Sequence, residues 1–214
     1  MAFAFLRRLA AAALVSAAFA AGAGAADAPQ PERTVDMAKL LQPGDLKDLT
    51  MGDGPVTVVE YGSLTCLHCA VFSKETLPQL KKAYIDTGKV RFVFREFSRN
   101  TLDVAGFVLA RCLGDDKALA ADELLFATQD KWAFVDKPLE PLLAAMRATG
   151  MTKDQATQCL NDKKIADGIV AVAKRANDEV KLSGTPTFVI DGKVYGGELT
   201  FDQLKAILDP LVKS

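Results

Sequence analysis

Two cysteines, Cys66 and Cys69, enclose His68, the only histidine of the chain, in the segment "SLTCLHCAVF". Cysteines at this spacing can form a structural disulfide, hold a metal ion, or exchange a disulfide with another molecule. A structural zinc site usually takes four Cys or His ligands, whereas the other two cysteines of this chain stand isolated in helical sequence. We therefore expect no metal and no cofactor, and a soft ion such as copper(I) on the two thiolates stays an alternative.

The elements predicted around the pair favour redox chemistry. The run "VTVVEYGS", which begins at Val56, is β-branched and bounded by glycine and proline, as expected of a buried strand. Residues 66–83 have the apolar spacing of a helix, which Pro78 should kink. Cys66 would then lie in the first turn of that helix, where unpaired N–H groups and the helix dipole stabilise a thiolate.

This placement predicts different roles for the two sulfurs. Cys66 is expected to be the sulfur that attacks and is attacked, and Cys69, one turn further on, the resolving thiol. A protonated His68 would stabilise the Cys66 thiolate further. Because a lower thiolate pKa stabilises the reduced protein, the pair should donate disulfides rather than reduce them. A permanent disulfide across so short a loop would stabilise the fold little.

The remaining elements predict an α/β fold. "KVRFVFREF", residues 89–97, alternates as a second strand, and residues 101–182 contain only helical signals. One helix there should begin with a capping box formed by Thr152 and Gln155. A hairpin made of "TPTFVI" and "VYGG" and a closing helix follow. A strand–helix–strand unit usually makes a parallel pair, so Cys66 should lie at the carboxyl edge of the sheet.

The first 26 residues have the pattern of an export signal. Arg7 and Arg8 precede an uncharged, alanine-rich run over residues 9–26, which is too weakly apolar for a spanning helix. We expect cleavage near Ala26 and a location outside the cytosol, where cysteines persist as disulfides. The next ten residues are polar and rich in proline, and we expect an exposed arm with no core of its own.

Charge and cysteine number limit the possible functions. The 26 basic and 27 acidic residues give a formal net charge of −1 at pH 7, so neither nucleic acid nor an anionic membrane surface is an expected partner. Spacing alone allows three pairings of the four cysteines, Cys66, Cys69, Cys112 and Cys159.

The chain resembles the thioredoxin-fold proteins and, within them, the DsbA-like periplasmic dithiol oxidases of the alphaproteobacterial form. The matching features are "VTVVEYGSLTCLHC", "GTPTFVI" and the order of the elements, which together cover nearly all of the expected mature chain. The resemblance implies a thioredoxin fold with an inserted helical domain. The implied divisions are a signal peptide at 1–26, an N-terminal arm at 27–50, the thioredoxin-like domain at 51–100 and 183–214, and the helical insertion at 101–182.

The resemblance also implies roles for single residues. Cys66 and Cys69 match the nucleophilic and resolving cysteines, and His68 matches the histidine that stabilises the first thiolate. Glu60 matches a buried acid that exchanges a proton with the second cysteine. A carboxylate at the solvated end of the strand is the alternative for Glu60.

Two further features of the family have counterparts. Thr185-Pro186 matches a substrate-binding cis-proline dipeptide that lies against the active-site disulfide, and an ordinary trans bond is its alternative. Cys112 and Cys159 match a second, structural disulfide, with two buried free thiols as the alternative. Leu67 and Thr185 depart from the enterobacterial motif at positions that tune the redox potential, so the strength of oxidation is not predicted.

The implied function is a dithiol oxidase that donates the Cys66–Cys69 disulfide to reduced exported proteins in the periplasm. A membrane-bound reoxidase of the DsbB type would restore the disulfide. The alternatives are a disulfide isomerase or reductase on the same fold, or a periplasmic soft-metal-binding protein. Isomerases of this superfamily commonly dimerise through an N-terminal extension, and the short polar arm here favours a monomer.

Overall fold

The structure is a computed structural model that describes residues 28–213, so the signal peptide expected at 1–26 lies outside the described residues. The strands are β1 Arg33–Thr34, β2 Leu49–Met51, β3 Val56–Gly62, β4 Val90–Glu96, β5 Thr187–Ile190 and β6 Lys193–Gly196. The α-helices are α1 Met37–Leu40, α2 Leu67–Val71, α3 Leu77–Leu80, α4 Thr101–Arg111, α5 Asp115–Ala127, α6 Gln129–Trp132, α7 Leu139–Met146, α8 Lys153–Leu160, α9 Lys163–Glu179 and α10 Phe201–Val212.

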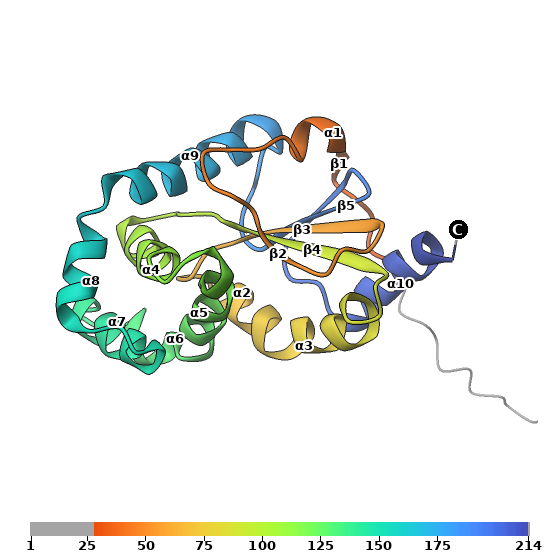
Figure 1. The fold of residues 1–214 in the computed structure, drawn as a ribbon. Helices are drawn as coiled ribbons and strands as arrows, with labels where there is room; N and C mark the ends of the chain where they lie inside the picture. Colours follow the sequence, from red (N-terminus) through yellow and green to blue (C-terminus); the bar gives the residue numbers. More distant parts are fainter. Residues whose placement is uncertain (1–27, 214) are drawn as a thin grey trace, which may run out of the picture.

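The sheet of the described chain has the order β1-β6-β5-β3-β4-β2. Strands β3 and β4 are parallel, in register from Val56 opposite Val90 to Gly62 opposite Glu96, and the other pairs are antiparallel. Helices α1 and α9 cover one face, α3 and α10 lie on the other, and α4 to α8 gather at one end (Figure 1). The strands predicted at "VTVVEYGS" and 89–97, and the hairpin β5–β6, are confirmed.

The N-terminal arm differs from the prediction. Arg33 and Thr34 form the edge strand β1, which pairs with β6, and Leu40 and Leu49 are almost fully buried. Residues 28–36 contain no buried side chain, as expected of an arm without a core of its own, but the pairing of β1 with β6 was not predicted. A two-residue edge strand has no periodicity of its own, because its partner supplies the pairing.

The crossover between β3 and β4 is one interrupted helix. Segment α2 runs into a π-helical turn over Phe72–Thr76, then into α3, and then into a second π-helical turn over Lys81–Ile85. Leu77 N donates to Phe72 O, five residues back. Pro78, in the first turn of α3, has no N–H to continue the regular ladder, and the helix widens just before it. The predicted interruption of the Cys-bearing helix at Pro78 is confirmed.

The helical segment from α4 to α9 is closed by caps and by a disulfide. Thr152 and Gln155 form the predicted capping box at the start of α8, with N···O distances of 2.9 and 3.2 Å. Cys112, directly after α4, is bonded to Cys159 of α8, with their Cα atoms 5.9 Å apart. The second disulfide that the resemblance implies is therefore present.

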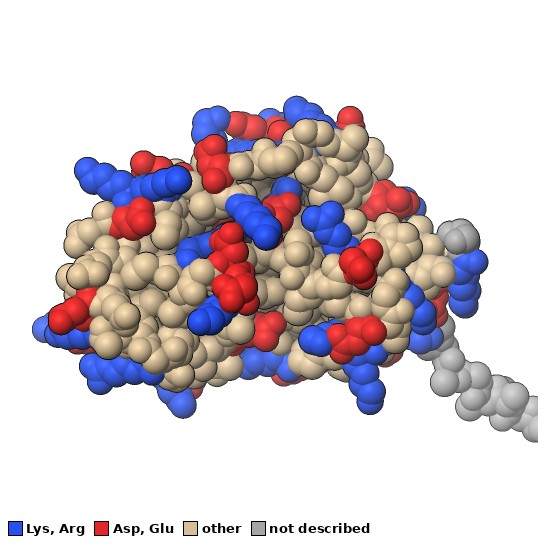
Figure 2. Space-filling model, in the orientation of Figure 1, with Lys and Arg blue, Asp and Glu red and all other residues tan. Residues whose placement is uncertain are grey.

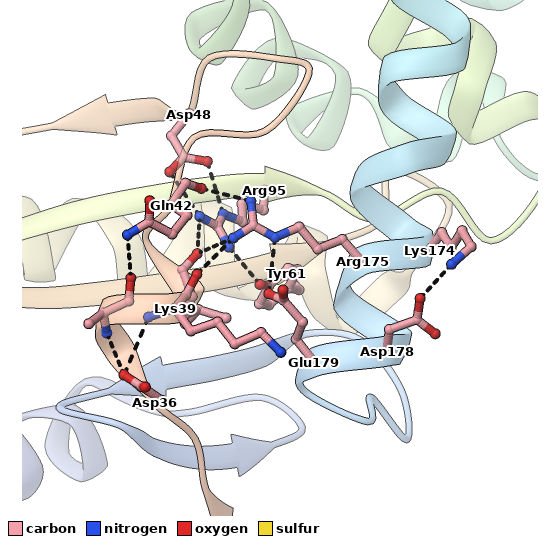
Figure 3. Close-up of polar contacts among 12 residues, drawn as sticks. Asp36, Lys39, Gln42, Asp48, Tyr61, Arg95, Lys174, Arg175, Asp178 and Glu179 are labelled. Carbon is pink, nitrogen blue, oxygen red and sulfur yellow. Dashed lines mark hydrogen bonds and ion pairs between the residues drawn. The ribbon is translucent and has the colours of Figure 1, made fainter.

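A cluster of polar side chains joins the segment between α1 and β2 to the face of the sheet that α9 covers (Figure 3). Arg95 of β4 donates to both carboxylate oxygens of Asp48, to Tyr61 Oη and to Leu40 O. Arg175 of α9 donates to the same Leu40 carbonyl at 3.0 Å. Both arginines thus donate to the backbone carbonyl of Leu40, the last residue of α1.

The surface carries charges of both signs. Lys and Arg side chains alternate with Asp and Glu side chains over the face seen in Figure 2, with no large area of one sign. Within residues 28–213, no helix combines the length and apolar character needed to cross a bilayer.

Asp122 of α5 is a buried carboxyl group without a hydrogen-bond partner for either oxygen. It lies near the buried pair in which Arg111 Nε and Nη2 donate to Glu96 at 2.6 and 2.5 Å. Burial, followed by the charge of Glu96, raises the pKa of Asp122 well above its usual range. Asp122 therefore holds its proton at pH values where an exposed aspartate has lost it.

Replacing Asp122 with asparagine is expected to raise the free energy of unfolding, increasingly so at higher pH. The raised pKa belongs to the folded state, so the stability that the bound proton gives is complete at acidic pH and is lost as pH rises through that pKa. The gain should grow by up to about 1.4 kcal/mol per pH unit between the ordinary aspartate range and the raised pKa of the folded state, and level off above it. Urea unfolding of Asp122→Asn over a pH series measures it. The exposed Asp167→Asn is the control, and a pH-independent gain would contradict the prediction.

Candidate active site

Cys66 lies in a turn at the carboxyl end of β3 and is the N-cap residue of α2. Its backbone N–H donates to Ser63 O at 3.1 Å, which closes the turn. Cys66 is 5% exposed, Cys69 is fully buried, and both are free thiols. The sulfur of Cys69 accepts from Ser63 N at 3.5 Å. Of the two sulfurs, Cys66 is the one placed nearer to solvent, as predicted.

The pKa values of the two thiols move in opposite directions. A hydrogen bond from the Cys69 side chain lowers the pKa of Cys66 to about 5, although burial acts against it. The Thr185 side chain, the Cys69 N–H and the charge of Arg99 lower it further. Burial and the bond to Cys66 raise the pKa of Cys69 well above its usual value. At neutral pH, Cys66 is therefore a thiolate and Cys69 a thiol.

Glu60 lies behind this pair on the central strand β3, between Phe94 and Phe188 of the neighbouring strands. It is 2% exposed, so the alternative of a solvated carboxylate is wrong. Burial, followed by the charge of Cys66, raises the pKa of Glu60 well above its usual value. The charge of Glu60 in turn raises the pKa of Cys69, so the two buried acids disfavour each other's ionisation.

The Thr185-Pro186 peptide bond is cis, as the resemblance implies. The loop that contains it lies against the active site, because Cys66 Sγ is 3.1 Å from Thr185 O, to which it donates when it carries its proton. Pro186 O accepts from Gly197 N at 2.9 Å, which ties this loop to the segment after β6. The predicted cysteine and proline segments, although far apart in sequence, therefore meet.

His68 has a different partner from the one expected. Its Nδ1 atom forms a hydrogen bond with Glu198 Oε2 at 2.9 Å, and its side chain is 72% exposed. The bond to Glu198 is the main cause that raises the pKa of His68, and the charge of Cys66 acts in the same direction. The structure thus pairs the imidazole with a carboxylate, and the predicted stabilisation of the thiolate by His68 stays a prediction.

Asp103 is a site residue that sequence reasoning missed. Its fully buried carboxylate accepts from Ser63 Oγ at 2.9 and 3.0 Å, from Thr65 N at 2.8 Å and from Arg99 N at 2.8 Å. In the sequence, Asp103 has the pattern of an ordinary acidic residue in the first turn of a helix. Its partners Ser63 and Thr65 lie in another element, so no local signal indicates the contact.

Gln129 of α6 was missed for the same reason. Its buried side chain donates from Nε2 to Leu64 O at 2.6 Å and to Cys66 O at 2.9 Å. Together with Asp103 it satisfies the backbone of the turn from two helices of the insertion. The helical insertion therefore holds the cysteine turn in place.

The residues that the structure describes do not form a multidentate metal site. Within residues 28–213, no group of three or more His, Cys, Asp and Glu side chains is arranged to hold a metal ion. The structure pairs His68 with Glu198, which leaves the two thiols as the donors that a soft ion would use.

Comparisons with known proteins agree with this geometry. The thioredoxin family model matches residues 47–210. A protein-disulfide oxidoreductase of Rickettsia typhi is 35% identical over 186 residues, which are 86% of this chain and 68% of that protein. A Rickettsia felis protein of the same description is 36% identical over 168 residues, and the chain spans 60% of its length.

Solved structures show the same fold. Alpha-DsbA1 of Wolbachia pipientis is 28% identical, with a TM-score of 0.75 over 82% of this chain and 95% of that one. BdbD of Bacillus subtilis, at 20% identity and a TM-score of 0.69, shares the fold. The predicted thioredoxin fold with inserted helices is confirmed. The chain belongs to the thioredoxin superfamily, among its DsbA-like disulfide oxidoreductases.

Proposed function

We propose that the protein is a dithiol oxidase that donates the Cys66–Cys69 disulfide to reduced exported proteins. The observation that supports the proposal most strongly is that the pKa of Cys66 is lowered while the pKa of Cys69 is raised. A thiolate at Cys66 stabilises the reduced protein, and a stabilised reduced form makes the disulfide a stronger oxidant. A reductase on this fold would be weakened by that stabilisation, because a stable reduced form gives up its electrons less readily.

The reaction begins from the oxidised protein. A client thiolate attacks Cys66 Sγ, the bond between Cys66 and Cys69 breaks, and a mixed disulfide forms on Cys66. Cys69 leaves as a thiolate with a high proton affinity and takes a proton from the buried Glu60. A second client thiolate then attacks the client sulfur of the mixed disulfide, and Cys66 departs as a stable thiolate. The client has lost two electrons, and the protein has gained them.

An unfolded client protein must bind to a surface of the oxidase that lies beside the reacting sulfur. Leu67, next to Cys66, is 62% exposed, and Phe134 and Leu139 of the insertion are 55% and 47% exposed. Exposed apolar side chains of this kind suit unfolded segments that expose apolar residues. We further propose that the cis-proline loop pairs with the client backbone as a strand would.

The proposed setting is the periplasm, reached through the export pattern of residues 1–26. There a membrane-bound oxidase of the DsbB type would accept the two electrons from reduced Cys66 and Cys69. The protein itself would need no cofactor for the exchange, because the electrons pass between sulfur atoms. We propose that it works as a monomer.

Oxidation of a reduced model protein tests the proposal. The oxidised wild-type protein should oxidise the client stoichiometrically, and Cys66→Ser should not. The equilibrium constant with glutathione should show that Cys66 and Cys69 are easily reduced. A scrambled client separates oxidase from isomerase, since an isomerase would restore its activity without net oxidation. Equal oxidation by Cys66→Ser and wild type would contradict the proposed function.

A further inference from the structure

Two basic side chains reach the turn that carries Cys66, and they differ in their partners. His68 Nδ1 is 2.9 Å from Glu198 Oε2, whose side chain is only 26% exposed. A protonated imidazole in this contact is neutralised by the carboxylate beside it. The pair therefore presents little net positive charge to Cys66.

Arg99 approaches the same turn from the segment between β4 and α4. Its Nε atom donates to Ser63 Oγ at 2.9 Å, and its Nη2 atom donates to Thr65 Oγ1 at 3.2 Å. Its own backbone N–H is held by Asp103 at 2.8 Å. Two side-chain hydrogen bonds therefore join Arg99 to the turn that Cys66 closes, and a third joins its backbone to Asp103 of α4.

The guanidinium of Arg99 is not neutralised in the same way. Arg95, Arg111 and Arg175 each form an ion pair with a carboxylate, at 2.9, 2.5 and 3.0 Å. Across residues 28–213, the structure records no such pair for Arg99, whose guanidinium bonds to hydroxyl groups instead. The Asp103 carboxylate, which accepts from the Arg99 N–H and from Ser63 Oγ, offsets part of this charge, and the remainder acts on the turn.

We propose that Arg99 is a positioning residue of the disulfide exchange, which fixes the turn before Cys66 and supplies the positive charge that stabilises its thiolate. The inference rests on the proposed function and deepens it, because it names a group outside the cysteine pair that contributes to the oxidising strength. The positive charge of Arg99 is one of the causes that lower the pKa of Cys66. The pKa of His68 is raised mainly by its hydrogen bond to Glu198.

The test is a titration of the Cys66 thiolate by its ultraviolet absorbance, in the reduced full chain. Arg99→Gln is expected to raise the Cys66 pKa by about half a unit to one unit, which is about a three- to tenfold change in the equilibrium constant with glutathione. Arg99→Lys, which keeps the charge, should restore more than half of the shift. His68→Gln should change the pKa less than Arg99→Gln does. The exposed Arg147→Gln is the matched control and should titrate as wild type.

Salt separates the charge of Arg99 from a purely structural role. Raising the ionic strength should raise the Cys66 pKa of the wild-type protein, because salt screens an exposed guanidinium, and this dependence should be weaker in Arg99→Gln. An Arg99→Gln protein with the wild-type pKa, a larger effect of His68→Gln, or a wild-type pKa that does not respond to salt would overturn the inference. The proposed function would stand in each case, because Cys66→Ser tests it separately.

Discussion

Replacing Cys69 with serine is expected to abolish turnover and to leave Cys66 in a stable mixed disulfide. The Cys66 thiolate can still attack a disulfide such as oxidised glutathione, which releases one glutathione thiolate and leaves the other half bonded to Cys66. In the wild-type protein the buried Cys69 lies one helical turn away and displaces that half. A serine hydroxyl cannot, because it forms no disulfide.

Mass spectrometry after incubation with oxidised glutathione measures this outcome. Cys69→Ser should carry one glutathionyl group, and wild type should end as the internal disulfide. Cys66→Ser is the matched control and should react slowly, because the pKa of Cys69 is raised and its sulfur is fully buried. Faster labelling of Cys66→Ser than of Cys69→Ser would reverse the assigned roles of the two sulfurs.

Removal of the second disulfide is expected to cost about 4 kcal/mol of the free energy of unfolding on the chain-entropy model. The bond between Cys112 and Cys159 closes 47 residues of sequence, and without it the unfolded chain gains the freedom of that loop. The loss should be seen in the double variant Cys112→Ala/Cys159→Ala, which removes both sulfur atoms of the bond.

Urea unfolding of the oxidised proteins measures the cost. The control is Cys66→Ala/Cys69→Ala, which also removes two cysteines but opens only a short loop, so the same model predicts a much smaller entropic loss. The variant without Cys112 and Cys159 should still oxidise a client at temperatures where it is folded. An equal or larger loss in the control would contradict the role assigned to loop length.

Local patterns were sufficient for the elements that carry the chemistry. The β-branched run at Val56, the alternation over residues 89–97 and the interruption at Pro78 each have a short-range physical cause and are found in the structure. The capping box at Thr152 also depends only on neighbouring residues. Patterns of this kind are therefore readable before the fold is known.

The contacts that complete the site depend on the fold itself. Asp103 and Gln129 contact the cysteine turn only because the helical insertion packs against it. Asp122 lacks a hydrogen-bond partner only because the packing of α5 buries its side chain. The pairing of His68 with Glu198 joins residues 130 positions apart. The spacing of residues in a sequence gives no information about contacts between residues so far apart, so the partner of His68 could not be predicted.

The insertion also has a consequence for the order in which the molecule is made. Strand β4 ends at Glu96, and β5, which pairs with β3, begins only at Thr187. A chain that emerges from its amino end therefore presents Cys66 and Cys69 long before the cis-proline loop can cover them. Closure of β3 against β5 must wait for the intervening helices, since pairing over so long a separation is slow. Until then, the nascent chain is itself an unfolded protein with free thiols. Such chains are the substrates on which the folded protein is proposed to act.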